Sequence, residues 1–177
     1  MRTSLGIALV TASLAAAADS QWALEKSTLT YHVSHPLHQV EGMSHAARGK
    51  AVCRAGDCQF LVAVPVKSFD SGDSNRDVHM IQVVRGAEYP MATVRFHLPE
   101  SAASSPVVHA DLQIELAGQT AVYKQVEFHL SIHANQADVT GTIPTRMSDF
   151  KIQPPSLLAI STKDEMPVRI DMTWRHE

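Results

Sequence analysis

Strict alternation of apolar and polar residues is the feature that most limits how this chain can fold. Over residues 126–133, valine, phenylalanine, leucine and isoleucine alternate with glutamate, histidine and serine. Successive side chains of a β-strand point to opposite faces, so each such segment indicates a strand with one dry and one wet face. The apolar residues that share a face in successive segments are Leu29, Tyr31, Val33, Phe60, Val62, Val64, Val66, Val94, Phe96, Leu98, Leu112, Ile114, Leu116, Val126, Phe128, Leu130, Ile132, Val168, Ile170, Met172 and Trp174.

Turn-forming residues interrupt these segments at short intervals. They occur at residues 54–57, 99–106, 117–118, 135–136 and 153–155. Short strands separated by such turns predict an all-β domain, which is either a sandwich or a barrel. The alternation alone does not choose between the two architectures.

One segment, over residues 75–84, breaks toward a helix. Ser74 is a suitable N-cap, and Asp77 three residues later resembles the second member of a capping box. Gly86 is placed to end the helix. Three apolar residues at helical spacing predict one apolar side, and they are Val78, Ile81 and Val84. A single short helix among strands is what a cap over one end of a barrel requires.

Several short motifs in a fixed order carry a family resemblance. They are Val-Glu-Gly at 40–42 with Gly49, Ser-Phe-Asp-Ser-Gly at 68–72, Arg-Asp-Val-His-Met at 76–80, Tyr-Pro at 89–90 and Arg-Met-Ser-Asp-Phe at 146–150. Together they resemble the YceI-like family of lipocalin-like polyisoprenoid-binding proteins, with Met80 in place of the usual leucine. The resemblance implies an elongated, antiparallel, eight-stranded lipocalin-like β-barrel with one short capping helix.

The resemblance also implies a bound isoprenoid, such as a quinone or a polyprenyl lipid. A barrel of about eight strands is just wide enough for one slender ligand. An apolar lining would bind the tail at about 0.8 kcal/mol per buried CH₂, although the same residues would equally fill a solid core. The candidate ligand-binding residues are Tyr31, Val33, His35, Phe60, Val62, Val64, Arg76, His79, Ile81, Phe96, Leu112, Ile114, Phe128, Leu130, Arg146, Phe150, Ile170 and Trp174.

Polar residues in and beyond the expected helix are the candidate head-group contacts. They are Arg76, Asp77, His79 and Arg146. The guanidinium fork of Arg76 suits a quinone carbonyl or a pyrophosphate. The alternative is structural, in which Asp77 caps the helix and either arginine pairs with an acidic neighbour.

Three further positions depart from the family pattern. Ser44 and Ala47 stand where the family carries bulky aromatic residues, and these small side chains either widen the cavity or face solvent. Lys151 replaces the expected glycine after Phe150, which leaves the local turn geometry open.

The N-terminus has the pattern of an export signal rather than of a buried helix. Arg2 precedes an apolar run at residues 5–14 that is too short to span a bilayer, and small residues follow at 16–18. We therefore expect a signal peptide at residues 1–18, a single YceI-like β-barrel domain at residues 19–177, and a periplasmic or secreted protein. No other stretch is long and apolar enough to be a transmembrane segment.

Two cysteines, Cys53 and Cys58, flank a predicted hairpin turn. Opposed residues of a hairpin lie within disulfide reach, and an exported protein is oxidised. We predict a disulfide between them. A redox-active pair is the alternative, but the spacing is not Cys-x-x-Cys.

Ten histidines in the sequence raise the question of metal binding. His32, His35, His38 and His45 lie close together in the chain, but their spacing along a strand turns them to different faces. We predict no metal site and no cofactor other than the lipid ligand. The alternative is a periplasmic, histidine-rich, copper- or zinc-binding or stress-related protein without a lipid.

Other functional classes lack their sequence signals. The net charge is −3 without a basic cluster, which argues against nucleic acid as a partner. The chain has no Gly-x-Ser-x-Gly elbow, phosphate loop or His-Glu-x-x-His, so we predict no catalytic residues and no enzyme. The sequence leaves open a homodimer, the identity of the lipid, and the choice between transport and storage.

Overall fold

The computed structural model describes residues 19–157 and 160–177, so the expected signal peptide lies outside it. The strands are β1 (Ser20–His35), β2 (His38–Ser44), β3 (Arg48–Arg54), β4 (Asp57–Pro65), β5 (Met91–Pro99), β6 (Val107–Leu116), β7 (Gln119–His133), β8 (Gln136–Ile143), β9 (Ser156–Leu157), β10 (Ile160–Ser161) and β11 (Val168–His176). The helical elements are α1 (Ser74–Val83) and three 3₁₀ turns, η1 (Val66–Ser68), η2 (Glu100–Ser104) and η3 (Ser148–Phe150).

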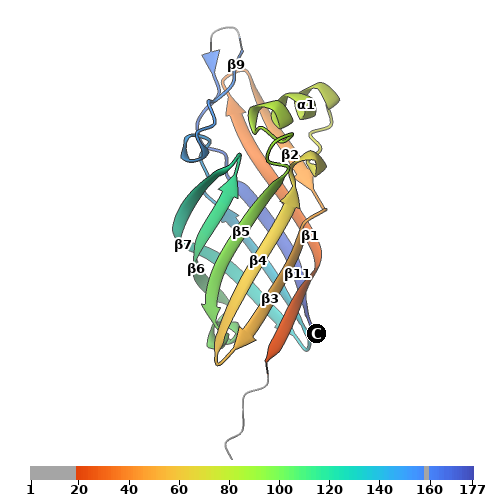
Figure 1. The fold of residues 1–177 in the computed structure, drawn as a ribbon, viewed down its shortest axis with the longest axis vertical. Helices are drawn as coiled ribbons and strands as arrows, with labels where there is room; N and C mark the ends of the chain where they lie inside the picture. The colour runs from red at the N-terminus through yellow and green to blue at the C-terminus, as the bar shows by residue number, and fades with distance from the viewer. Residues whose placement is uncertain (1–18, 158–159) are drawn as a thin grey trace, which may run out of the picture.

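The main sheet closes on itself to form a barrel (Figure 1). Its strands follow the order β11-β8-β7-β6-β5-β4-β3-β1-β2, and β11 also pairs with β1. β2 and β3 share one strand position, because β1 pairs with β3 over residues 20–23 and with β2 over residues 29–35. Within the described residues the closed barrel therefore has eight strand positions, which confirms the predicted fold class.

The predicted alternation sets which side chains face inward. In β6, Val108, Ala110, Leu112 and Ile114 are buried, whereas the residues between them are exposed. Register then brings apolar side chains of neighbouring strands together in the interior. Phe128, for example, lies over Gly141 of β8, where an added Cβ would come within 2.5 Å of the phenyl ring.

The two ends of the barrel differ (Figure 1). At the helix end lie α1, the β1–β2 turn and the small β9–β10 hairpin. At the disulfide end lie the β3–β4 turn, η2 and the C-terminus.

Helix α1 begins one residue earlier than the sequence suggests. The carboxylate of Asp73, not Ser74, is the N-cap and accepts hydrogen bonds from the backbone N–H groups of Asn75 and Arg76. The prediction of one apolar side is also partly wrong, because Val78 is 56% exposed. Val84 is buried and lines the barrel interior as predicted, and Met80 and Val83 join it on the face turned to the barrel.

The helix ends in a Schellman motif. The N–H of Gly86 donates to the carbonyl of Ile81, and the N–H of Arg85 donates to the carbonyl of Gln82. The left-handed residue is Arg85, with φ of 55°, and not the glycine that the sequence favoured. Gly86 is needed for a close approach, because an added Cβ would lie 3.0 Å from the Ile81 side chain.

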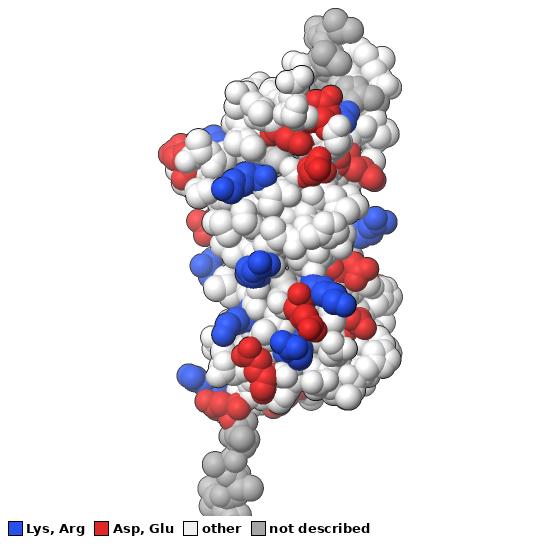
Figure 2. Space-filling view, turned by 90° about the vertical axis from the view of Figure 1, so that its right-hand side faces the viewer, with Lys and Arg blue, Asp and Glu red and all other residues white. Residues whose placement is uncertain are grey.

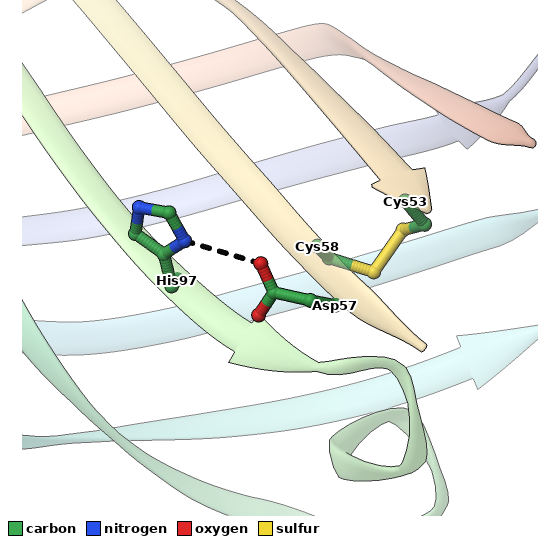
Figure 3. Close-up of a disulfide and its surroundings, with 4 residues drawn as sticks. All are labelled: Cys53, Asp57, Cys58 and His97. Atoms are coloured by element: carbon green, nitrogen blue, oxygen red, sulfur yellow. Dashed lines mark hydrogen bonds and ion pairs between the residues drawn. A yellow bond between two sulfur atoms is a disulfide. The ribbon is translucent and has the colours of Figure 1, made fainter. Parts of the chain in front are cut away.

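The predicted disulfide is confirmed (Figure 3). Cys53 and Cys58 are opposite each other in the β3–β4 hairpin, and Ala55 and Gly56 in the turn both have positive φ. Both cysteines are buried. Asp57 of the same hairpin is exposed, and one of its carboxylate oxygens lies 3.2 Å from the Nδ1 atom of His97 on the neighbouring strand β5.

Lys151 resolves the question of the turn after Phe150. It has φ of 54° and ends η3, so lysine adopts the left-handed conformation that glycine favours.

We predict that Lys151→Gly stabilises the protein by about 0.5–1 kcal/mol, because it removes a left-handed Cβ at some cost in unfolded-chain entropy. Urea denaturation measures this change. Lys163→Gly, at a residue without positive φ, is the matched control and should not gain stability. A loss of stability in Lys151→Gly equal to that of the control would contradict the prediction.

Candidate ligand-binding cavity

The interior of the barrel is hollow. An upper chamber of about 430 Å³ lies beneath α1 at the helix end. A lower chamber of about 250 Å³ lies at the disulfide end. The upper volume alone falls within the roughly 300–1,000 Å³ usual for small-molecule sites. The inward residues therefore line a space and do not simply fill a core.

The two chambers share five wall residues, which we call the neck. The neck consists of Leu29, Val64, Ala92, Val94 and Ile143. These residues come from β1, β4, β5 and β8, and Val64 and Ala92 are directly opposite each other across β4 and β5. The hollow is thus elongated along the barrel, with its two parts separated by small and medium aliphatic side chains.

The upper chamber has apolar walls and a helical roof. Val33 and Ile114 contribute from the strands, Phe150 contributes from η3, and Met80 and Val83 contribute from α1. Such walls exclude water and offer no directional contacts, so they suit a hydrocarbon.

Polar groups join these walls on the helix side. His35 is buried, and its two ring nitrogens already bond to the backbone. Nε2 lies 3.0 Å from the carbonyl oxygen of Ile160, and Nδ1 accepts a hydrogen bond from the N–H of Leu37. His35 therefore ties the β1–β2 turn to β10 at the edge of the upper chamber.

Tyr31 brings a phenol into the upper chamber. Burial, and secondarily the negative charge of Asp77, raise the pKa of this phenol, while the positive charge of Arg76 opposes the rise. Tyr31 therefore stays neutral and keeps its O–H as a donor. Among the described residues this hydroxyl has no hydrogen-bond partner, and its ring lies against Gly42, where an added Cβ would come within 2.3 Å.

Arg76 reaches the upper chamber from the first turn of α1. Its Nη2 atom donates to the backbone carbonyl of Ser71 at 3.0 Å. Asp77 accepts the N–H of Ser71, so it stabilises the loop before the helix and does not cap it. In the described part of the chain, neither Arg76 nor Arg146 forms an ion pair within 4.0 Å. The acidic partner of the structural alternative therefore lies beyond that distance, and the guanidinium of Arg76 bonds to Ser71 instead.

The lower chamber combines aliphatic walls with a cluster of aromatic side chains. The rings of Phe60 and Phe96 stack with centroids 4.5 Å apart, and Trp174 meets Phe60 edge-on at 5.6 Å. Trp22 and the disulfide complete this end of the wall. The charged residue in this wall is Glu100, in η2 at the outer rim.

The structure places nearly all of the predicted ligand-binding residues in chamber walls. Those in the upper chamber are Tyr31, Val33, His35, Arg76, His79, Ile114 and Phe150. Those in the lower chamber are Phe60, Val62, Phe96, Leu112, Phe128, Leu130, Ile170 and Trp174. Val64 belongs to both chambers. Contact of these residues with a ligand stays a prediction.

Ile81 and Arg146 line neither chamber, contrary to the prediction. Ile81 packs beside Gly86 at the end of the helix, because α1 turns its Met80 and Val83 face toward the barrel. Arg146 is exposed, and its backbone N–H lies 3.4 Å from the Tyr123 hydroxyl.

Sequence reasoning also missed several wall residues. Met80 and Val83 follow Arg76 by four and seven residues, which is the spacing of one helix face. The sequence therefore contained this signal, but the charged arginine at its first position does not suggest an inward face. Ala92 had no such signal, because its role at the neck depends on register between strands.

The two small residues of the first hairpin do not widen the cavity. Ser44 and Ala47 are 1% and 3% exposed, so they do not face solvent. Neither lines a chamber. The hydroxyl groups of Ser44 and Ser68 lie 2.7 Å apart, so this contact fixes η1 against β2.

The histidines do not gather into a metal centre in the described residues. No three side chains of His, Cys, Asp or Glu lie close enough together there to hold one ion. His32 pairs with Glu41 at 3.3 Å, and the side chain of His38 is outside the described atoms. Nothing here therefore favours the metal-binding alternative.

The outer surface carries mixed charge. On the face in Figure 2, basic and acidic side chains are interspersed. Within residues 19–157 and 160–177, we find no helix with the length and apolar character needed to traverse a bilayer.

Comparison with known proteins supports the fold. A family model described as YceI-like domain matches residues 21–174. A polyisoprenoid binding domain from Saccharophagus degradans, implicated in plant cell wall breakdown, is 15% identical with a TM-score of 0.72, covering 88% of this chain and 98% of that one. BcnA from Burkholderia cenocepacia is 15% identical with a TM-score of 0.67, covering 83% and 95%. The YceI protein of Campylobacter jejuni is 11% identical with a TM-score of 0.53, covering 99% and 93%. No curated protein matches this sequence.

Proposed function

Because the chain belongs to the YceI-like family, we propose that it binds a long-chain isoprenoid lipid, of the quinone or polyprenyl type, inside its barrel. The observation that carries this proposal is the elongated apolar hollow, whose polar groups gather beside α1. The polyisoprenoid binding domain of Saccharophagus degradans has the same fold, which supports the choice of ligand class.

The apolar walls supply the affinity in this proposal. Each buried CH₂ of a tail contributes about 0.8 kcal/mol, and ordering the flexible chain offsets part of that gain. Contacts of this kind have no direction, so they hold a tail without fixing which end enters first.

The polar groups of the upper chamber supply the orientation. Tyr31 offers a neutral O–H, and Arg76 offers guanidinium N–H groups on the same side of the chamber. Both are donors, which suits a ligand whose head carries carbonyl or phosphate oxygens. We assign no chemical reaction to the site.

The disulfide, which is typical of oxidising compartments, and the expected export signal at residues 1–18 support a location outside the cytoplasm. We therefore place the protein in the periplasm, or outside the cell, as a carrier or a store of the lipid.

Native purification followed by solvent extraction and mass spectrometry tests the proposal. We expect an isoprenoid lipid that survives purification, because a tail in a dry barrel dissociates slowly. Extracts without any isoprenoid, together with failure of the delipidated protein to bind a long-tail quinone, would reject the proposed ligand class.

We predict that Arg76→Ala lowers the amount of lipid retained while leaving the fold intact, because it removes a head-group donor from the upper chamber. The same extraction measures it. Arg95→Ala is the matched control, since Arg95 is exposed and lies 3.7 Å from Glu115 on the outer face of β5. Equal lipid content in both variants would show that Arg76 does not contact the head group.

A further inference from the structure

The division of the hollow at the neck bears on which isoprenoids fit. The upper chamber holds the donors, whereas the lower chamber is lined by aromatic and aliphatic groups up to its rim. A ligand with its head beside α1 must therefore pass its tail through the neck to gain the contacts of the lower chamber.

Ala92 is the smallest side chain of the neck. It lies beside Val64, its register partner on the neighbouring strand β4, and the other neck residues are Leu29, Val94 and Ile143. Isoprenoid chains carry methyl branches, so their passage needs more width than a straight acyl chain. Among the neck residues, the alanine side chain takes up the least of that width.

We infer that the neck measures tail length and that Ala92 is a specificity-determining residue for long isoprenoid tails. This inference rests on the proposed function. A short tail ends in the upper chamber and does not cross the neck. A long tail crosses it and gains affinity from the lower chamber.

The protein carries its own reporter for this crossing. It has two tryptophans, Trp22 and Trp174, and both line the lower chamber. A tail that enters that chamber changes the surroundings of both indole rings, so it shifts their fluorescence emission. A tail confined to the upper chamber does not reach them.

The test compares two quinones with the same head, one with two isoprene units and one with eight, on delipidated protein. The variants are Ala92→Leu, which narrows the neck, and Ala63→Leu, which makes the same change beside Val64 on the outer face of β4. Ala63 alternates with the wall residues Val62 and Val64 and lines neither chamber.

We expect Ala92→Leu to weaken binding of the long-tail quinone by about tenfold or more and to abolish the tryptophan shift. Binding of the short-tail quinone should fall much less, because that tail meets Ala92 only as one wall residue of the upper chamber. Ala63→Leu should match the wild type with both ligands. Thermal unfolding checks that both variants fold, and Ala92→Val provides a milder narrowing with an intermediate loss if leucine prevents folding.

If Ala92→Leu weakens binding of both quinones by the same factor, or weakens neither, the inference that the neck discriminates tail length is wrong. A tryptophan shift of equal size with the short tail in the wild type would also show it to be wrong. If the wild type binds neither quinone, the proposed function itself fails, and the neck inference fails with it. Failure of the proposed function can be told apart from failure of the neck inference alone, because it is seen with the wild type before any variant is compared.

Discussion

Pairing of β1 with β11 is the constraint on which the rest of the structure depends. The ladder runs from Trp22 opposite His176 to Tyr31 opposite Val168. It joins the two ends of the sheet, so every apolar strand face turns toward one shared interior. A closed sheet of about eight strands is just wide enough to leave room for a slender ligand. The hollow, its neck and its two chambers all follow from that closure.

The two ends of the hollow contribute differently to ligand binding. At the disulfide end, stacked rings such as Phe60 and Phe96 provide apolar contact area but no directional hydrogen bonds. At the helix end, Tyr31 and Arg76 provide donors at defined positions. Burial of hydrocarbon grows with tail length, whereas one or two hydrogen bonds contribute about 1 kcal/mol each. Affinity therefore comes mainly from the tail, and the polar groups mainly decide its orientation.

The sequence was sufficient for those features that local patterns control. Alternation along β6 and β7 predicted their inward residues, and the spacing of Cys53 and Cys58 about a turn predicted their disulfide. Features that depend on how helices and strands pack against each other were harder to predict from the sequence. The sequence identified the inner face of α1 only in part, because Val84 is buried but Val78 is exposed, and Arg76 lies on the same side as Met80 and Val83.

The neck was beyond sequence reasoning for a different reason. Ala92 matters because register sets it opposite Val64 at the level where the chambers meet, and no periodicity in the chain encodes that level. Lys151 is a third case, since the family resemblance indicated an unusual turn but only the backbone shows that lysine adopts the left-handed conformation there.

Enclosure of the tail by the barrel can be measured as the heat-capacity change when the delipidated protein binds a long-tail quinone, by titration calorimetry at several temperatures. Burial of a hydrocarbon tail removes apolar surface from water, so we expect a clearly negative change that grows with tail length. A change near zero for every tail would mean that the chain stays in water and that the barrel does not enclose it.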